Sequence, residues 1–199
     1  MPRHSRNRAV FLDRDGVMNP PVMYAAWGAD SPTDPDDLTL YPDAARAVRT
    51  IHEAGFLAIL ASNQPGVAKR KYSLATFDAI DHRLTKLLAD AGAALDAKFY
   101  CLHHPTGALS EYRRECECRK PKPGMLREAA AQFGLDLATC YFIGDSERDF
   151  LAAEAAGCKA VVLARESNAD WVRSPKVKVV KNLDAATREI CGEGLTNVA

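Results

Sequence analysis

Short apolar runs alternate with helical repeats along most of the chain, and this alternation constrains the fold more than any other feature of the sequence. We predict strands at residues 9–12, 56–61, 97–100, 140–143, 160–163 and 177–180. We predict helices at residues 42–54, 73–91, 124–133, 147–156 and 183–191. Strands that alternate with helices form mainly parallel sheets with helices on both faces. The sequence therefore predicts an α/β fold with a Rossmann-like parallel sheet.

Polar side chains follow three of the predicted strands at the point where each strand ends. Asp13 and Asp15 come after the first strand, Ser62 after the second, and Asp145 after the fourth. Open α/β sheets bind their ligands at the carboxyl ends of the strands. We therefore expect these side chains, which are far apart in the sequence, to meet at one edge of the sheet.

Three carboxylates with no nearby histidine favour a hard cation bound by oxygen, which we predict to be Mg²⁺. A carboxylate can also attack phosphorus and form an aspartyl phosphate, while its neighbour protonates the leaving oxygen and then activates water. Ser62 and a lysine from the basic stretch 119–122 would neutralise the remaining phosphoryl oxygens. A polar turn explains Asp13-Arg14-Asp15-Gly16 equally well when that stretch is considered alone.

Charge and hydropathy limit the partners of the protein. The chain has 199 residues and no formal net charge, with 26 basic and 26 acidic residues. A neutral chain without a basic stripe argues against a nucleic-acid phosphatase and against attraction to a membrane surface. We find no apolar run that approaches a membrane span and no signal peptide. We therefore expect a cytoplasmic monomer, organised as a single domain over residues 1–199 without a large cap domain.

Two close pairs of soft metal ligands lie on one stretch of the chain, Cys101-x-His103 and Cys116-x-Cys118. Three thiolates and one imidazole make a closed tetrahedral site, which is the pattern of structural zinc. We predict a zinc-braced loop over residues 101–118, with His104 as an alternative ligand to His103. Free thiols in a reducing compartment are the other explanation. We expect the remaining cysteines to be small core residues, namely Cys140, Cys158 and Cys191.

Residues 19–41 show no helical or strand pattern and are rich in Pro and Asp. A long loop beside a candidate site is more often functional than filler. We therefore predict that this irregular segment is a lid that faces the substrate. A loop that is merely packed against the domain is the alternative.

Four motifs occur in the order in which they stand in the haloacid-dehalogenase-like (HAD-like) phosphatases, a family that the chain resembles. They are Asp13-x-Asp15-Gly16, Ser62-Asn63, Lys120-Pro121-x-Pro123 and Gly144-Asp145-x-x-x-Asp149. The resemblance implies that Asp13 is the nucleophile and Asp15 the general acid and base. It implies that Ser62 and Lys120 hold the phosphoryl group. Mg²⁺ would be bound by Asp13, the main-chain carbonyl of Asp15, and Asp145, and the last aspartate of the fourth motif would orient its neighbours.

The cysteine loop resembles one subgroup of that family, the heptose bisphosphate phosphatases and the histidinol-phosphate phosphatases. In this subgroup such a loop precedes Arg-Lys-Pro, and here it runs into Arg119-Lys120-Pro121. The first two motifs are more similar to the heptose enzymes, which implies removal of the 7-phosphate from a phosphorylated sugar, D-glycero-D-manno-heptose 1,7-bisphosphate. Histidinol phosphate is the alternative substrate, and a zinc-braced binding module without catalysis is the alternative function. The resemblance places five residues around the sugar and its phosphates: Arg14, Asn19, Asn63, Gln64 and Arg119.

Overall fold

A parallel sheet of six strands forms the centre of the structure, a computed structural model that describes residues 8–26, 28–165 and 177–195. Its strand order is β5-β4-β1-β6-β7-β8, and every neighbouring pair is parallel. The strands are β1 (Ala9–Leu12), β4 (Leu57–Asn63), β5 (Ala97–Cys101), β6 (Tyr141–Gly144), β7 (Lys159–Leu163) and β8 (Val179–Val180). The predicted Rossmann-like sheet is therefore confirmed.

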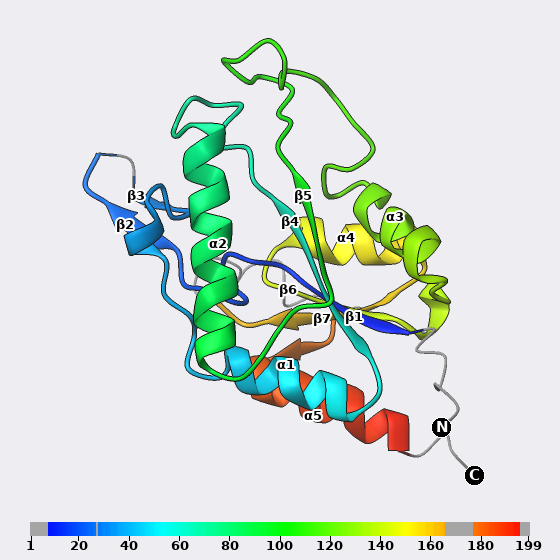
Figure 1. The fold of residues 1–199 in the computed structure, drawn as a ribbon. Helices are drawn as coiled ribbons and strands as arrows, with labels where there is room; N and C mark the ends of the chain where they lie inside the picture. The colour runs from blue at the N-terminus through cyan, green and yellow to red at the C-terminus, as the bar shows by residue number, and fades with distance from the viewer. Residues whose placement is uncertain (1–7, 27, 166–176, 196–199) are drawn as a thin grey trace.

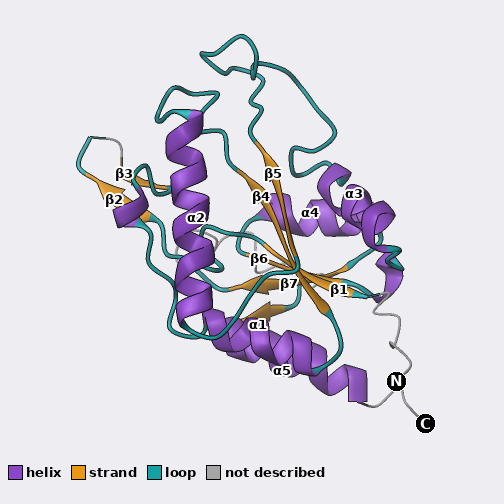
Figure 2. Ribbon diagram, viewed as in Figure 1, coloured by secondary structure: helices purple, strands orange, loops and turns teal. Residues whose placement is uncertain are grey.

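Helices cover both faces of this sheet (Figures 1 and 2). They are α1 (Ala44–Glu53), α2 (Leu74–Asp90), α3 (Gly124–Phe133), α4 (Glu147–Ala156) and α5 (Leu183–Leu195). Residues of α1, α2 and α5 share one buried apolar cluster, and residues of α3 and α4 share the other. The helices therefore lie on the two faces of the sheet as the alternating sequence pattern predicted.

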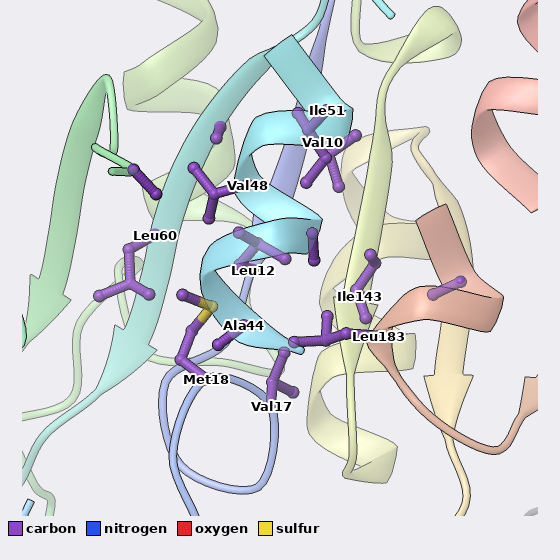
Figure 3. Close-up of a cluster of buried hydrophobic side chains, with 14 of the residues drawn as sticks. Val10, Leu12, Val17, Met18, Ala44, Val48, Ile51, Leu60, Ile143 and Leu183 are labelled. Carbon is purple, nitrogen blue, oxygen red and sulfur yellow. The ribbon is translucent and has the colours of Figure 1, made fainter. Parts of the chain in front are cut away.

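Every residue of the central strand β1 is apolar, because both faces of the strand are buried. Val10 and Leu12 belong to the cluster beneath α1, where Figure 3 shows them with Val48 and Ile51 of that helix. Ala9 and Phe11 belong to the cluster on the opposite face. Successive side chains of a strand point to opposite faces, so a strand between two helical layers has no position left for a polar residue. The first polar residue after β1 is therefore forced to the edge of the sheet.

The prediction that residues 19–41 are irregular is wrong in part. An antiparallel hairpin forms from β2 (Val22–Tyr24) and β3 (Gly28–Asp30), followed by a short 3₁₀ turn, η1 (Pro35–Asp37). The Tyr24 hydroxyl ties the segment together, because it donates to Asp37 Oδ2 at 2.7 Å and accepts from the Thr33 N–H at 2.8 Å. Strands of only three residues are too short to give a recognisable period in the sequence.

The described residues contain no second large domain beyond the sheet, its helices and this hairpin. Across the same residues, no helix is both long enough and apolar enough to cross a bilayer. Residues 1–7, 27, 166–176 and 196–199, which the predicted single domain includes, lie outside the described residues.

Candidate active site

The carboxyl ends of β1, β4 and β6 open into a cavity of about 450 Å³. Asp13 directly follows β1, and its N–H still donates to the Ile143 carbonyl of β6 at 3.1 Å. Asp145 directly follows β6, whereas Ser62 is the second-last residue of β4 rather than the residue after it. The cavity wall includes all three, together with Asp15 and Lys120. The sheet therefore brings the predicted catalytic residues to one place.

Lys120 lies buried at the centre of this group. Its Nζ is 2.9 Å from Asp13 Oδ1 and 2.6 Å from Asp149 Oδ1, and it donates to the Ala61 carbonyl at 3.0 Å. Burial alone would lower the pKa of Lys120, but Asp13 and Asp149 outweigh it and raise the pKa. A lysine that stays charged beside Asp13 can neutralise the oxygens of a phosphoryl group transferred there.

The main chain of Lys120 is fixed by the side chain of Asn63. The Lys120 N–H donates to Asn63 Oδ1 at 3.0 Å, and Asn63 Nδ2 donates to the Lys120 carbonyl at 3.0 Å. This pair of bonds joins the end of β4 to the loop that carries the lysine, across 57 residues of sequence. Asn63 therefore sets the position of Lys120, and it also lines the cavity as expected of a substrate contact.

Asp15 is surrounded by hydrogen-bond donors. Its Oδ1 accepts from Arg14 Nε at 3.2 Å and from Asn19 Nδ2 at 3.0 Å. Its Oδ2 accepts from Gln64 Nε2 at 2.8 Å and from Ser31 Oγ at 2.7 Å. Burial alone would raise the pKa of Asp15, but Arg14 and the other donors lower it. The carboxylate is thus held in its ionised form and in one orientation.

The structure separates the residues predicted to contact the substrate into two groups. Asn63 and Arg119 line the cavity. Arg14, Asn19 and Gln64 are fully buried and contact Asp15 instead. A direct contact between these three and the substrate remains a prediction. Ser31 also bonds Asp15, but the sequence analysis did not identify it as a candidate site residue. The one sequence feature that pointed to Ser31 is its position in the segment predicted to be a lid.

The carboxylates of Asp13, Asp145 and Asp149 come close enough for ligand atoms to lie within 4.8 Å of one another. Burial, reinforced by Asp13 and Asp149, raises the pKa of Asp145 to about 7. Burial also raises the pKa of Asp13 to about 6, despite the opposing charge of Lys120. A cation between carboxylates reverses such shifts, so this donor set fits a hard divalent metal ion.

Asp149 differs from the other two acids in its contacts. Its Oδ2 accepts from the N–H groups of Asp145 and Ser146, at 3.2 and 3.0 Å, and from Ser146 Oγ at 2.7 Å. Its Oδ1 faces Lys120. Both oxygens of Asp149 are thus engaged, which supports the prediction that Asp149 orients its neighbours while Asp13 and Asp145 bind the metal.

Gly16 allows the turn after β1 to approach Asp145. Its φ is +79°, a value that side chains rarely adopt, and a Cβ atom at this position would lie 1.8 Å from Asp145 Oδ2. The glycine of the first motif is therefore required both by the turn and by the carboxylate that faces it.

The predicted zinc ligands converge at the carboxyl end of β5, and their ligand atoms all lie within 4.8 Å of one another. Cys116 Sγ is 3.5 Å from Cys101 Sγ and 3.2 Å from Cys118 Sγ, and Cys118 Sγ is 3.4 Å from His103 Nδ1. A tetrahedron with Zn–S bonds of ~2.3 Å has edges of roughly 3.8 Å. These four residues therefore fit a structural zinc ion without large movement.

His103, not His104, faces the thiols. His104 Nδ1 instead accepts from the N–H of Thr106 at 3.2 Å. The loop is linked to the cavity by Arg119, whose Nη1 donates to the His103 carbonyl at 3.1 Å. Of the other cysteines, Cys140 and Cys158 are buried in the core, as expected, and Cys191 is half-buried in α5.

Two aspartates after one strand, a buried lysine and a third aspartate after a neighbouring strand define the site of a metal-dependent phosphatase of the HAD-like class. Residues 117–186 match the family model described as HAD-hydrolase-like. The chain is 36% identical over 173 residues to the D-glycero-β-D-manno-heptose-1,7-bisphosphate 7-phosphatase of Escherichia coli K12, which covers 82% of this chain and 87% of the relative. The corresponding Yersinia pestis protein is 34% identical over 186 residues, covering 89% and 95%.

A solved structure agrees with these relatives. The D,D-heptose 1,7-bisphosphate phosphatase from B. bronchiseptica, complexed with magnesium and phosphate, matches with a TM-score of 0.79 and 31% identity. The match covers 94% of this chain and 99% of that one. The chain belongs to the HAD-like hydrolases, in the family of the heptose-1,7-bisphosphate 7-phosphatases, and is thus a phosphoric monoester hydrolase.

Proposed function

We propose that the protein removes the 7-phosphate of D-glycero-D-manno-heptose 1,7-bisphosphate through an aspartyl phosphate on Asp13, in the biosynthesis of nucleotide-activated heptose. The observation that carries this proposal is the contact of buried Lys120 with Asp13 at the cavity edge, 2.9 Å apart. The substrate follows from the names of the relatives, which are heptose bisphosphate phosphatases.

In the first step an oxygen of Asp13 attacks phosphorus and the bond from phosphorus to the sugar oxygen breaks. Lys120 and Ser62 hold the transferred oxygens. Asp15, which is ionised in the free site, takes up a proton from solvent when substrate binds and gives that proton to the leaving oxygen. In the second step Asp15, as a carboxylate, takes a proton from water. The water oxygen attacks phosphorus, which releases inorganic phosphate and restores Asp13. The donors around Asp15 stabilise the ionised form that this second step needs.

Two metal ions complete the proposal. Asp13, Asp145 and the main-chain carbonyl of Asp15 would hold Mg²⁺, which when bound neutralises phosphoryl charge. Cys101, His103, Cys116 and Cys118 would hold a structural Zn²⁺ with no part in the chemistry. The zinc loop would then keep the segment that leads into Lys120 in place. We also propose that the protein is a single-domain, cytoplasmic monomer.

Steady-state rates of phosphate release test the proposal. The wild-type protein with Mg²⁺ should cleave heptose 1,7-bisphosphate with a much higher kcat/KM than histidinol phosphate, and the reverse order would favour the histidinol enzymes. Asp13→Asn should lower kcat by a factor on the order of 10⁴ or more, because it removes the nucleophile. Normal turnover by Asp13→Asn would rule out the mechanism, and no turnover of any phosphate ester by the wild type would favour a binding module.

A further inference from the structure

The turn that follows β4 carries two neighbouring side chains, Lys71 and Tyr72, and each reaches a partner of the Asp15 carboxylate by a different route. Directly before them, Arg70 has a φ of +55°, and among the described residues it is the one non-glycine residue with a positive φ. Backbone strain of this kind often marks a functional segment, because the surrounding structure must hold the residue in place. The turn therefore presents Lys71 and Tyr72 in fixed directions.

Lys71 connects this turn to the β2–β3 hairpin. Its Nζ forms an ion pair with Asp30 Oδ2, and both side chains are only partly exposed. The other oxygen of Asp30, Oδ1, accepts from the Ser31 N–H at 2.8 Å. Ser31 Oγ in turn donates to Asp15 Oδ2 at 2.7 Å. An unbroken series of contacts therefore runs from a lysine at the surface to the Asp15 carboxylate.

The hairpin needs such a tie to stay in place. A single two-stranded hairpin is at best marginally stable by itself, and each strand of this one has only three residues. Asp30 is the last residue of β3, so the ion pair with Lys71 holds the hairpin at the point that leads into Ser31. Without this tie, the Ser31 hydroxyl would lose its fixed position beside Asp15.

Tyr72 reaches Asp15 by the second route. Its hydroxyl donates to Gln64 Oε1 at 3.4 Å, and Gln64 Nε2 donates to Asp15 Oδ2 at 2.8 Å and to Ser62 Oγ at 3.1 Å. Burial raises the pKa of Tyr72 to about 12, so the hydroxyl remains a donor. A glutamine amide turned by 180° would point its oxygen at the carboxylate. The Tyr72 donor disfavours that orientation, because it would then face the amide N–H groups.

Close packing fixes the Tyr72 ring as well. A Cβ atom at Gly66 would lie 2.1 Å from the ring, so the ring lies directly against the backbone of the turn. The hydroxyl is thereby kept at the end of Gln64 that faces away from Asp15.

We propose that Lys71 and Tyr72 are positioning residues for Asp15, the first acting through Ser31 and the second through Gln64. The inference rests on the proposed function, because it takes Asp15 as the general acid and base. The described residues that line the cavity include neither Lys71 nor Tyr72. Their loss should therefore lower kcat and leave KM nearly unchanged.

Lys71→Met tests the first route. It should lower kcat about threefold at an unchanged KM, since Ser31 is held less firmly. Lys71→Arg keeps the charge and should recover most of the rate. Lys86→Met breaks an exposed ion pair with Asp90 inside α2 and should leave kcat within about 1.5-fold of wild type. A higher KM with unchanged kcat would mean that Lys71 only neutralises Asp30 at the cavity wall, and would overturn its positioning role.

Tyr72→Phe tests the second route, because it removes the hydroxyl and keeps the ring. We expect kcat to fall about threefold, again at an unchanged KM. Tyr141→Phe is the matched control, since its hydroxyl accepts one bond of 3.2 Å from Lys159 at the start of β6, away from the cavity. A wild-type kcat in Tyr72→Phe would overturn the role of Tyr72.

Double variants that also contain Ser31→Ala separate the two routes. Lys71→Met should add little to the loss caused by Ser31→Ala, because both changes act through the same hydroxyl. Tyr72→Phe should still lower kcat about threefold in that background, because Gln64 is unaffected. If instead Lys71→Met had its full effect there, or Tyr72→Phe had none, the corresponding route would be wrong.

Rates are compared at a temperature at which thermal unfolding shows every variant to be folded. The same ratios of kcat are measured with p-nitrophenyl phosphate as well as with heptose 1,7-bisphosphate. A wild-type protein that cleaves only the nitrophenyl ester would overturn the proposed substrate, whereas the kcat ratios on that ester still decide whether Lys71 and Tyr72 position Asp15.

Discussion

Ser31 Oγ donates a hydrogen bond to Asp15 Oδ2 over 2.7 Å, across 16 residues of sequence. The contact joins the segment after β3 to the residue proposed as general acid and base. Asp30 and Ala29 of the same hairpin line the cavity as well. The segment predicted to face the substrate therefore also holds part of the catalytic machinery in place.

We predict that Ser31→Ala lowers kcat for heptose bisphosphate roughly tenfold, the equivalent of ~1.4 kcal/mol, because one donor to Asp15 is lost. Ser31→Thr keeps the hydroxyl and should recover most of the rate. Thr33→Ala removes a hydroxyl of the same segment that bonds Tyr24 rather than Asp15, so it is the matched control. Equal rates for Ser31→Ala and Thr33→Ala would contradict the prediction.

Asn63→Ala should release the main chain of Lys120. The variant loses two hydrogen bonds to that residue, and we expect kcat to fall by about one to two orders of magnitude as the lysine leaves its place beside Asp13. Phosphate release at saturating substrate measures the effect. Thermal unfolding of the same variant shows whether the fold is retained, and a folded Asn63→Ala protein with full activity would disprove this role.

We predict that the stability of the magnesium-free protein falls as the pH rises through about 6 to 7. The ordinary pKa of an aspartate is 3.8, whereas in the folded protein the pKa is about 6 for Asp13 and about 7 for Asp145. The folded state therefore binds these protons more tightly, so their contribution to the free energy of unfolding is present below pH 3.8 and is lost as the pH rises through the folded values. Melting temperatures of wild type and Asp145→Asn across this range isolate the part due to Asp145.

Magnesium should reverse this loss. At ~100 times its Kd a ligand adds about 2.7 kcal/mol of stability, and protons compete with the cation for the same carboxylates. The rise in melting temperature on adding Mg²⁺ should therefore be larger above the folded pKa of Asp145 than below it. The Asp145→Asn variant should lose most of this Mg²⁺-dependent rise in melting temperature. An undiminished rise in that variant would show that Asp145 is not a magnesium ligand.

Protein purified without added zinc should contain about one equivalent of zinc per chain, as a four-ligand site requires. Cys116→Ser should lower the zinc content and the activity together, because the loop leads directly into Arg119 and Lys120. Cys191→Ala removes a cysteine outside the cluster and should change neither. A zinc-free wild-type protein that is folded and fully active would exclude the structural zinc.

The sequence predicted the sheet and the meeting of Asp13, Ser62 and Asp145 because both depend on local signals. Apolar runs without interruption mark strands buried on both faces, and polar residues at their ends mark the edge where parallel strands finish. Topology then brings together residues more than a hundred positions apart. The cysteine pairs were equally informative, because their spacing is rare outside metal sites.

The surroundings of Asp15 could not be predicted in the same way. Whether Arg14, Asn19 and Gln64 point at a substrate or at a neighbouring carboxylate depends on side-chain direction, which sequence spacing does not give. The β2–β3 hairpin was missed because its strands are three residues long.

The contact between the Gly16 position and Asp145 has a consequence for engineering this enzyme. Any substitution at residue 16 would displace Asp145 or the turn after β1, since a new Cβ would occupy space already taken by Asp145 Oδ2. A side chain at residue 16 could be accommodated only with a second change near Asp145, which is far away in the gene, so single mutations at residue 16 should rarely yield an active enzyme.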